Sequence, residues 1–241
     1  MNKLNGNQIK FAMVVLMTLG SLKSFLPANL AILYTVLATT AVGWFAFAAV
    51  EGVSHTSSII KYNVRLYAGA IILFVGNVVI NTGFGMAKAP IGDNGFLTLA
   101  FGVTAITAFS KIRMDQMTSE KLLKLSIGVI TMALGFVSQY GYIVIPVMII
   151  SYFLRKNQTR REYGLIILSM LLLASSIFAG LKSGNIMVEI LAKPDFAFII
   201  MVPFLRLYSG QKGSMSKVLQ YGFYCYYPVH LWIITIVLNL I

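Results

Sequence analysis

The sequence contains few charged residues and few reactive ones. Charged side chains make up 11% of the 241 residues, against 58% hydrophobic, and the reactive groups include one cysteine, two histidines and seven acids. A single cysteine, Cys225, excludes an internal disulfide and a cysteine-based metal cluster. The sequence also lacks a Gly-x4-Gly-Lys-Ser/Thr phosphate loop, a His-Glu-x-x-His zinc motif and a Gly-x-Ser-x-Gly nucleophile elbow. ATP hydrolysis, zinc proteolysis and common serine hydrolysis therefore have no support.

Long apolar runs occupy most of the chain. The mean hydropathy is +0.83, which is typical of integral membrane proteins and not of a soluble domain of this length. We predict an all-α, polytopic integral membrane protein with about nine transmembrane helices, each near the length that crosses a hydrocarbon core of roughly 30 Å. The predicted spans are residues 9–26, 29–53, 65–84, 95–110, 122–137, 139–154, 164–181, 186–207 and 218–241.

Two stretches of the sequence allow a choice of interpretation. The first apolar run has no small-residue cleavage site, so we interpret it as a retained helix rather than a signal peptide. Residues 125–154 could form one long tilted helix instead of two that meet around Gly135–Gly141. No linker, low-complexity tract or internal repeat divides the sequence, so we expect a single transmembrane domain over residues 1–241.

The chain is strongly basic, with a net charge of +12. In the nine-span arrangement, fifteen of the 19 Lys and Arg residues lie on one side of the membrane and four on the other. Because basic residues concentrate in cytoplasmic loops, this bias predicts a cytoplasmic N-terminus and a C-terminus outside, and it favours two helices in residues 125–154. Topology and attraction to anionic membrane lipid explain the basicity without a nucleic-acid partner. The fifteen are Lys3, Lys10, Lys61, Arg65, Lys111, Arg113, Lys121, Lys124, Arg155, Lys156, Arg160, Arg161, Arg206, Lys212 and Lys217; the four are Lys23, Lys88, Lys182 and Lys193.

A first group of reactive residues lies at the cytoplasmic end of the second predicted span. Glu51 and His55 are four residues apart, so on a helix they share a face and the carboxylate can orient the imidazole. Arg65 opens the next span on the same side. A base beside an anion clamp suits a phosphate-bearing donor such as an acyl coenzyme A. Alternatively, Glu51 and His55 pair with Lys61 or Arg65 and simply join two helices.

A second candidate, His230, lies inside the apolar segment 218–241. An ionisable side chain is costly in the bilayer and indicates function there. Tyr226 and Tyr227 precede His230 by four and three positions on the same helical face. Pro228 leaves one backbone carbonyl without its helical partner and predicts a kink. A structural interpretation also stands, in which a neutral His230 bonds a hydroxyl or carbonyl of another span.

Other polar residues have simpler interpretations. Glu189 and Lys193 are four residues apart and can pair at the outer end of the eighth span. Asn81, Asn94 and Thr98 suit hydrogen bonds between helices. A small transporter would explain an intramembrane histidine, yet the sequence has no repeat and almost no acids at mid-membrane for coupling.

Many of these residues belong to an ordered series of short elements. The series is Glu51-Gly52 with His55-Thr56, Tyr62 and Arg65-Leu66; Asn94 with Thr98-Leu99 and Gly102; Tyr140-Gly141; Tyr208 with Gly210 and Gly213; and Phe223 with Tyr227-Pro228 and His230-Leu231. In this order, over nearly the whole chain, the elements resemble the TraX family. That family consists of polytopic inner-membrane proteins named for acetylation of the pilin N-terminus in conjugative pili.

The resemblance implies an activity. The TraX family is similar to membrane acyltransferases, which take an acyl group from a cytoplasmic thioester and pass it to an acceptor at the membrane. By resemblance we expect acetyl-CoA as the donor, a peptide or pilin-like amino group as the acceptor, and the bacterial cytoplasmic (inner) membrane as the location. The candidate catalytic residues are His230, His55 and Glu51, and the candidate donor-binding residues are Arg65, Tyr62 and Tyr227.

One departure from the family pattern bears on catalysis. Family members typically have a Lys followed ten and eleven positions later by Asp-His in the first span, whereas here Lys10 is followed by Gly20-Ser21. An Asp-His pair is what a general base with its orienting carboxylate would look like. Either His230 or His55 supplies the base of an active acetyltransferase, or the chain is a catalytically inactive membrane partner or accessory subunit of a peptide-export or pilus system.

Overall fold

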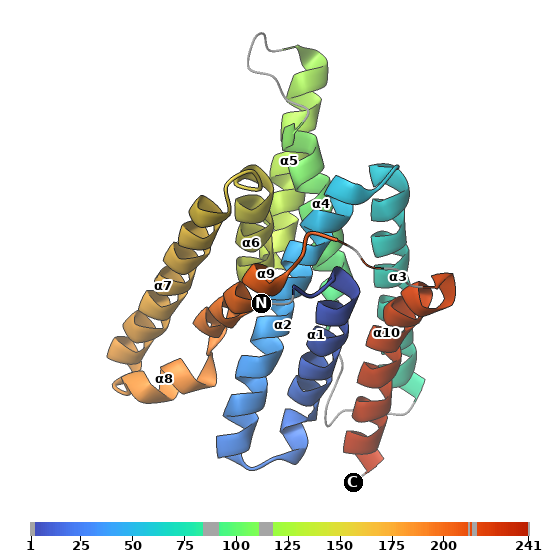
Figure 1. Cartoon of the computed structure of the whole chain (residues 1–241). Coiled ribbons are helices and arrows are strands. Elements are labelled where there is room, and N and C mark those ends of the chain that lie inside the picture. The colour runs from blue at the N-terminus through green and yellow to red at the C-terminus, as the bar shows by residue number, and fades with distance from the viewer. Residues whose placement is uncertain (1–2, 84–91, 111–117, 212, 214–215, 241) are drawn as a thin grey trace.

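The computed structural model describes residues 3–83, 92–110, 118–211, 213 and 216–240, with the backbone alone for residues 217–220. Regular structure in this part of the chain is helical, as the sequence predicts. The long helices pack side by side and reverse direction from one to the next (Figure 1). The elements are α1 (Gly6–Ser21), η1 (Leu22–Phe25), α2 (Ala28–His55), α3 (Ile59–Gly83), α4 (Gly95–Ser110), α5 (Ser119–Val137), α6 (Gly141–Phe153), α7 (Gln158–Ser183), α8 (Ile186–Ala192), η2 (Asp195–Ile200), α9 (Met201–Leu207) and α10 (Lys217–Leu240).

The surface of the helix bundle is apolar. Helices α2, α3 and α7, together with residues Tyr221–Leu240 of α10, are long and apolar enough to cross a membrane, and α4 and α6 are shorter apolar helices. Phe74 on α3 and Leu171 on α7 are each 63% exposed. Lipid solvates such side chains, whereas water does not. The chain is therefore a membrane protein, while the count of nine spans and the orientation of the termini stay predictions.

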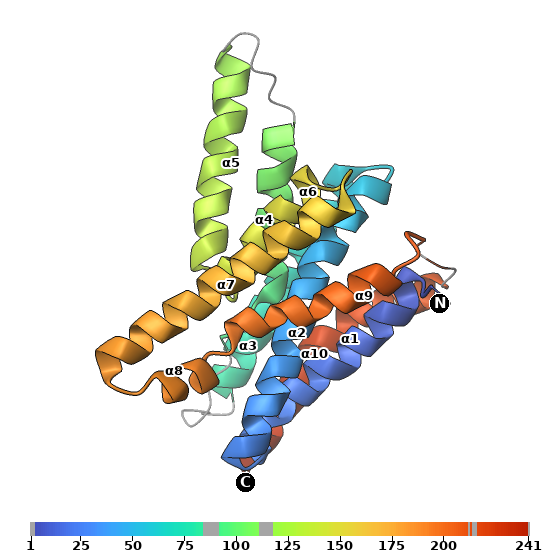
Figure 2. The same cartoon turned by 60° about the vertical axis from the view of Figure 1, so that its left-hand side comes forward.

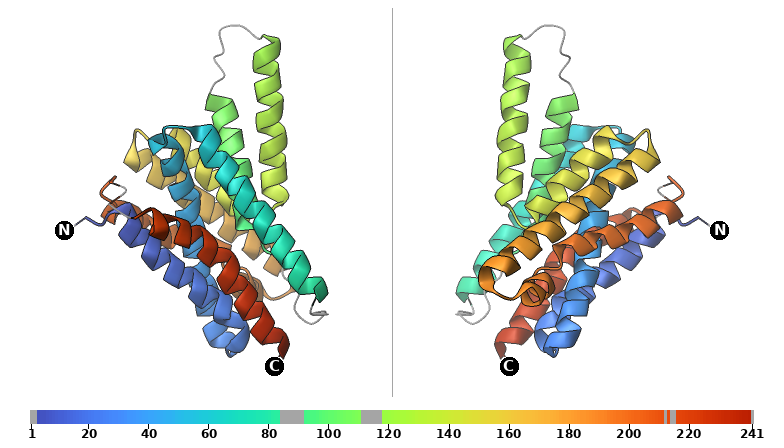
Figure 3. Two further views of the ribbon diagram at one scale, coloured as in Figure 1. Left: turned by 90° about the vertical axis from the view of Figure 1, so that its right-hand side faces the viewer. Right: turned by 90° about the vertical axis from the view of Figure 1, so that its left-hand side faces the viewer.

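Helix α5 extends beyond the other helices at one end of the bundle (Figures 2 and 3). It begins at a Thr118 cap, whose hydroxyl accepts a hydrogen bond from the backbone N–H of Lys121. Glu120 and Lys124 form an ion pair one turn apart on this exposed end. The hydrogen bond from Lys124 holds the pKa of the Glu120 carboxyl below its usual range. The polar end of α5 is thus suited to water rather than to lipid.

Helix α2 lies at the centre of the packing, against α1, α6 and η2. Trp44 and Phe47 are each 2% exposed, and their ring centroids are 5.3 Å apart. A Cβ at Gly43 would lie 2.7 Å from Sδ of Met201, so this glycine allows α9 to approach α2 closely. The core therefore forms around α2. The terminal helix α10 packs against α3 and α1.

The chain turns back on itself between α5 and α6. Tyr140 has φ of 53°, in the left-handed region that is uncommon for residues other than glycine. A Cβ at Gly141 would overlap the carbonyl oxygen of Gly135, so a glycine is needed where α6 begins. The prediction of two helices in residues 125–154 is confirmed, and the alternative of one long helix is wrong.

The predicted eighth span, residues 186–207, is not one helix, and the prediction is wrong on this point. Helix α8 ends at Ala192, and the 3-10 segment η2 leads into α9. Pro194 precedes η2 and has no backbone N–H, so it cannot continue the hydrogen-bond ladder of α8. The hydroxyl of Ser169 on α7 donates to the carbonyl of Phe196 at 2.8 Å and so provides a hydrogen-bond partner for one backbone carbonyl of η2.

Side-chain hydrogen bonds join the helices as the sequence predicts for Asn94 and Thr98. The Asn94 amide donates to the carbonyl of Ala70 on α3 at 3.0 Å, and the Thr98 hydroxyl donates to the carbonyl of Gln139 at 2.9 Å. The sequence prediction did not include the 2.9 Å bond from the Trp232 indole N–H to Asn77 Oδ1, which joins α10 to α3.

Glu162 on α7 forms an ion pair with Arg206 on α9, at 2.7 Å between Oε2 and Nη2. The Glu162 side chain is 10% exposed, so its carboxylate depends on this partner and on Gln158 Nε2, 2.9 Å from Oε1. We expect Glu162→Ala to lower the thermal midpoint of the purified protein by about 2–4 °C, the shift that corresponds to roughly 1 kcal/mol for a chain of this size. Adding Arg206→Ala should cause little further loss, because the pair is already broken. A midpoint equal to that of the exposed control Arg160→Ala would contradict the role of the ion pair.

Candidate functional site

His230 lies on the inner face of α10 and is 6% exposed. Its Nδ1 is 3.0 Å from the backbone carbonyl oxygen of Tyr226. A carbonyl only accepts, so this bond places the proton of a neutral ring on Nδ1 and leaves Nε2 with a free lone pair. The ring also stacks on that of Tyr226, with centroids 5.0 Å apart and planes at 12°. His230 is therefore held in one orientation with a basic nitrogen available.

The basic nitrogen of His230 faces α1. Its Nε2 is 3.3 Å from Oγ of Ser21, the last residue of α1. One turn earlier, the hydroxyls of Thr18 and Tyr226 are 2.7 Å apart. These four residues, Thr18, Ser21, Tyr226 and His230, form a polar contact between α1 and α10 that we call the α1/α10 seam. Part of the structural interpretation is thus met, since His230 does bond a hydroxyl of another helix.

Tyr227 points to a different neighbour. Its hydroxyl accepts a 3.3 Å hydrogen bond from the backbone N–H of Gly95 at the start of α4. Its ring packs edge-on against Phe96, with centroids 5.2 Å apart, and lies 5.7 Å from the His230 ring. Tyr227 therefore forms one wall beside His230, while it also fixes α10 to α4.

Gly20, the position at which the resemblance predicts an acid, lies at a close crossing of α1 and α2. A Cβ at this position would overlap the Cβ of Ala38 and lie 3.2 Å from the carbonyl oxygen of Tyr34. No side chain fits there without moving one helix. The packing of α1 against α2 therefore favours glycine at this position over the expected acid.

Glu51 and His55 do lie together at the end of α2, as their spacing predicts. Their side chains approach to 3.7 Å, although His55 Nδ1 is nearer to the backbone carbonyl of Glu51, at 2.9 Å. The Glu51 carboxylate also accepts a 3.4 Å hydrogen bond from the hydroxyl of Tyr208. Burial, followed by the charge of Glu51, raises the pKa of Tyr208 to about 12. We call Glu51, His55 and Tyr208 the α2-end cluster.

Tyr62 and Arg65 lie on α3, and Tyr62 packs next to the α2-end cluster. A Cβ at Gly52 would lie 2.7 Å from the Tyr62 hydroxyl, so the glycine after Glu51 makes room for this tyrosine. Arg65 is exposed, and its Nε donates to the carbonyl of Lys61 at 3.2 Å. Among the described residues, Glu51 forms no ion pair with Lys61 or Arg65; from outside α2 it accepts the hydrogen bond of Tyr208 and interacts electrostatically with Arg161 on α7.

The sequence reasoning missed three residues next to this cluster. The guanidinium of Arg161 lies over the Phe47 ring, 5.0 Å from its centroid. The Arg161 Nε and the Trp44 indole N–H are buried donors for which the described residues provide no acceptor. Trp44 and Phe47 lie seven and four positions before Glu51, so an analysis of this helical face could have found these two residues. Arg161 lies on α7, and helical spacing on α2 gave no signal for it.

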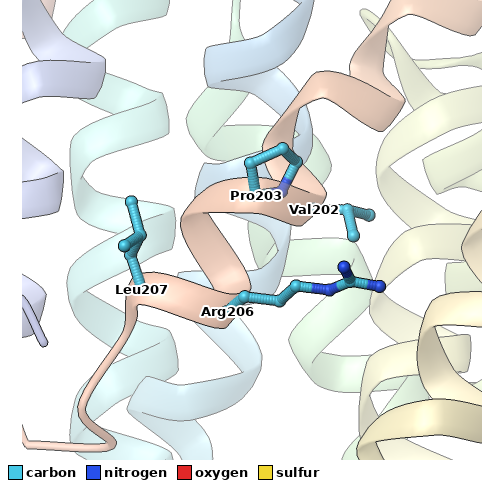
Figure 4. A pocket seen from close by; sticks show the side chains of 4 residues that line it. All are labelled: Val202, Pro203, Arg206 and Leu207. Atoms are coloured by element: carbon cyan, nitrogen blue, oxygen red, sulfur yellow. The ribbon is translucent and has the colours of Figure 1, made fainter. Parts of the chain in front are cut away.

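The seam and the α2-end cluster belong to different helices. In the described part of the chain, His230 contacts residues of α1 and α10, whereas Glu51 contacts residues of α2 and Tyr208. A surface pocket on α9 is lined by Val202, Pro203, Arg206 and Leu207 and includes none of the predicted site residues (Figure 4). His230 and the α2-end cluster therefore do not contact each other through the hydrogen bonds of the described residues, and a common substrate would have to join them.

A family model described as TraX protein matches residues 5–238. No curated protein sequence and no solved structure matches the chain. The family match includes α1 to α9 entirely and α10 as far as residue 238, so both the seam and the α2-end cluster lie within it.

Proposed function

The chain belongs to the TraX family, and on that basis we propose that it is a membrane-bound acyltransferase. The proposed reaction passes an acetyl group from a cytoplasmic coenzyme A thioester to an amino group of a peptide or pilin-like subunit. The proposed location is the bacterial cytoplasmic membrane. Family membership and the apolar surface of the helix bundle support both proposals.

The observation that carries the proposal is that His230 is buried, with Nδ1 bonded to the Tyr226 carbonyl and Nε2 left as a basic nitrogen. An acyl transfer from a thioester to an amine needs a base for the proton of the nucleophile and an acid for the departing thiolate. His230 Nε2 can take the first proton and return it to the sulfur, and the hydrogen bond from Nδ1–H to Tyr226 stabilises the imidazolium between the two steps. His55, the other histidine, is 55% exposed and is the second choice for this role.

The α2-end cluster and its neighbours are assigned to the donor. Arg65 is exposed at the end of α3 that is predicted to face the cytoplasm, so its guanidinium can bind the phosphates of coenzyme A. Tyr62 lies behind it against Gly52 and would line the same region. Glu51 and His55 complete a polar rim at that end of α2.

The test of the proposed function is direct. Protein purified in lipid nanodiscs, given acetyl-CoA and a short peptide with a free amino terminus, should release coenzyme A thiol and yield a peptide heavier by one acetyl group. A peptide with a blocked terminus and no lysine is the matched control and should remain unchanged. If the free peptide and a panel of pilin-like peptides all stay unacetylated while no thiol is released, the proposal is wrong.

The donor assignment makes a separate prediction. Removing a charge-assisted hydrogen bond costs about 1.5–3 kcal/mol, so Arg65→Gln should raise KM for acetyl-CoA by roughly 10- to 150-fold and change kcat much less. Lys61→Gln, which removes a cation one turn earlier on the same helix, should leave KM nearly unchanged. Steady-state kinetics at varied acetyl-CoA distinguish these outcomes. An equal rise in both variants would mean that general electrostatic attraction, rather than Arg65, holds the donor.

The second candidate function is that of a catalytically inactive membrane partner. The close packing of Gly20 on Ala38 favours it, because the position of the family acid is fully occupied by helix contact. This function predicts a stable complex with another membrane protein after extraction in mild detergent. It also predicts that His55→Ala and His230→Ala variants support the cellular process as well as the parent chain does.

A further inference from the structure

Ser21 has a geometry that its sequence position alone would not indicate. Its hydroxyl donates to the carbonyl of Met17 at 3.1 Å, and its Oγ lies 3.3 Å from Nε2 of His230. The single hydroxyl proton therefore has to turn from the Met17 carbonyl to Nε2 before His230 can accept it. A hydroxyl near a helical carbonyl is ordinary in this protein, as at Ser126 and Ser138, where the hydroxyl also bonds the carbonyl four residues earlier. Ser21 differs because a histidine nitrogen with a free lone pair is its second neighbour.

The arrangement has the three parts of an activated nucleophile: a hydroxyl, a base within reach of it, and a group that orients the base. Here they are Ser21 Oγ, His230 Nε2 and the Tyr226 carbonyl. The Ser21 to His230 distance of 3.3 Å is somewhat longer than the best hydrogen bonds and falls in the range found before substrate binds. The Tyr226 ring, stacked on His230, restricts the base to this orientation.

Ser21 is also the more accessible member of the pair. It is the last residue of α1, and it is half-buried, whereas His230 is 6% exposed. The next residues, Lys23 and Ser24 of η1, are exposed. In the predicted topology this end of α1 faces away from the cytoplasm, so an acceptor that arrives there meets the hydroxyl before it meets the imidazole, whereas the thioester of acetyl-CoA has to reach Ser21 from the cytoplasmic side of the helix bundle.

We infer that Ser21 is the nucleophile that carries the acyl group between donor and acceptor, an inference that rests on the proposed acyl-transfer function. In the first step Ser21 Oγ attacks the thioester carbonyl, its proton passes to His230 Nε2, the C–S bond breaks, and the thiolate leaves with that proton as coenzyme A thiol. In the second step the amine attacks the serine ester, its proton passes to Nε2, and the C–O bond breaks. The proton then returns to Ser21 Oγ, which restores the free hydroxyl.

The experiment follows the acyl-enzyme without an acceptor, so that it does not depend on which peptide is the substrate. Protein in nanodiscs is incubated with radiolabelled acetyl-CoA, quenched in acid, digested and mapped by mass spectrometry. We expect label on the peptide that contains Ser21, and none in Ser21→Ala or His230→Ala. Ser24→Ala, three residues away and more exposed, is the matched control and should be labelled as fully as the parent.

The chemistry of the bond provides a second measurement. Ser21→Cys should still be labelled, and its thioester should be cleaved by neutral hydroxylamine faster than the oxygen ester of the parent. Circular dichroism and monodisperse gel filtration establish that each variant is folded. If Ser21 only supported the contact between α1 and α10, the Ser21→Ala protein would still be labelled, and the label on Ser21→Cys would be no more sensitive to hydroxylamine than the label on the parent.

The outcomes separate the inference from the proposed function. Label on Ser21 supports the inference, whether or not the chosen peptide is acetylated. Acetylated peptide with no labelled protein, and with full activity in Ser21→Ala, overturns the inference and leaves the acetyltransferase function in place. Neither label nor product in the parent protein overturns both. Label that persists in Ser21→Ala on another residue also overturns the role of Ser21.

Discussion

Replacement of His230 by alanine is expected to lower the rate of acetyl transfer by about 10²- to 10⁴-fold, the usual contribution of a positioned general base. The loss should fall on kcat, because His230 is buried and acts on the proton of the nucleophile rather than on the phosphates of the donor. The measurement is the initial rate of coenzyme A thiol release with peptide present, compared with the parent protein in the same nanodiscs.

Two further variants make this result specific to the imidazole. His230→Gln keeps a polar side chain of similar reach but has no basic nitrogen, so it should be as inactive as the alanine variant. His55→Ala removes the exposed histidine at the far end of α2 and should lose less than tenfold. A His230→Ala variant that is folded and fully active would remove His230 from the mechanism. If His55→Ala lost acetyl transfer while His230→Ala kept it, the base would instead be His55 of the α2-end cluster.

The second large effect concerns stability. Restoring the family's acid with Gly20→Asp is expected to prevent stable folding rather than to raise activity, because the new Cβ overlaps Ala38 and Tyr34 limits any shift. Overpacking costs typically 1–3 kcal/mol, and an aspartate within the membrane adds about 2.5–3.5 kcal/mol. Together these approach the ~5 kcal/mol at the lower end of the stability of many proteins. Loss of the monodisperse peak in fluorescence-detected gel filtration would report the effect.

Companion variants divide this cost into its parts. Gly20→Ala introduces the overlap without the charge and should retain a folded protein of lowered thermal midpoint. Adding Ala38→Gly to Gly20→Ala removes the opposing Cβ and should restore much of that midpoint. If Gly20→Ala is as stable as the parent, the α1/α2 crossing is looser than the structure indicates, and the packing explanation for the missing acid is wrong.

The positions of most helices could be predicted because lipid imposes a simple requirement on the sequence. The run predicted at residues 95–110 is α4, Gly95–Ser110, and the run predicted at 29–53 lies within α2, Ala28–His55. Hydropathy averages over many residues, and for that reason it missed the break at Pro194, where a single residue removes a backbone donor. The turn between α5 and α6 was predictable because the charge asymmetry supplied independent evidence.

The candidate site was less predictable, because its contacts join distant parts of the chain. The proximity of Glu51 to His55 follows from helical spacing, and the structure confirms it. The partner of Glu51 from outside its helix, Tyr208, is 157 positions away. Helical periodicity carries no information about which helices become neighbours, so the Ser21 to His230 contact could come only from the fold.

The α1/α10 seam also sets a condition on biosynthesis. Ser21 and His230 are separated by 209 positions, and at synthesis rates of about 5–20 residues per second the second is added on the order of 10–40 s after the first. Helix α1 can meet α2 in the meantime, since the two are adjacent in the chain and in space. Ser21, the proposed nucleophile, therefore emerges from the ribosome well before His230, its proposed base. A nascent chain that stops before α10 can bury the α2 core, yet it lacks His230, so under the proposed mechanism it has no base with which to transfer an acetyl group.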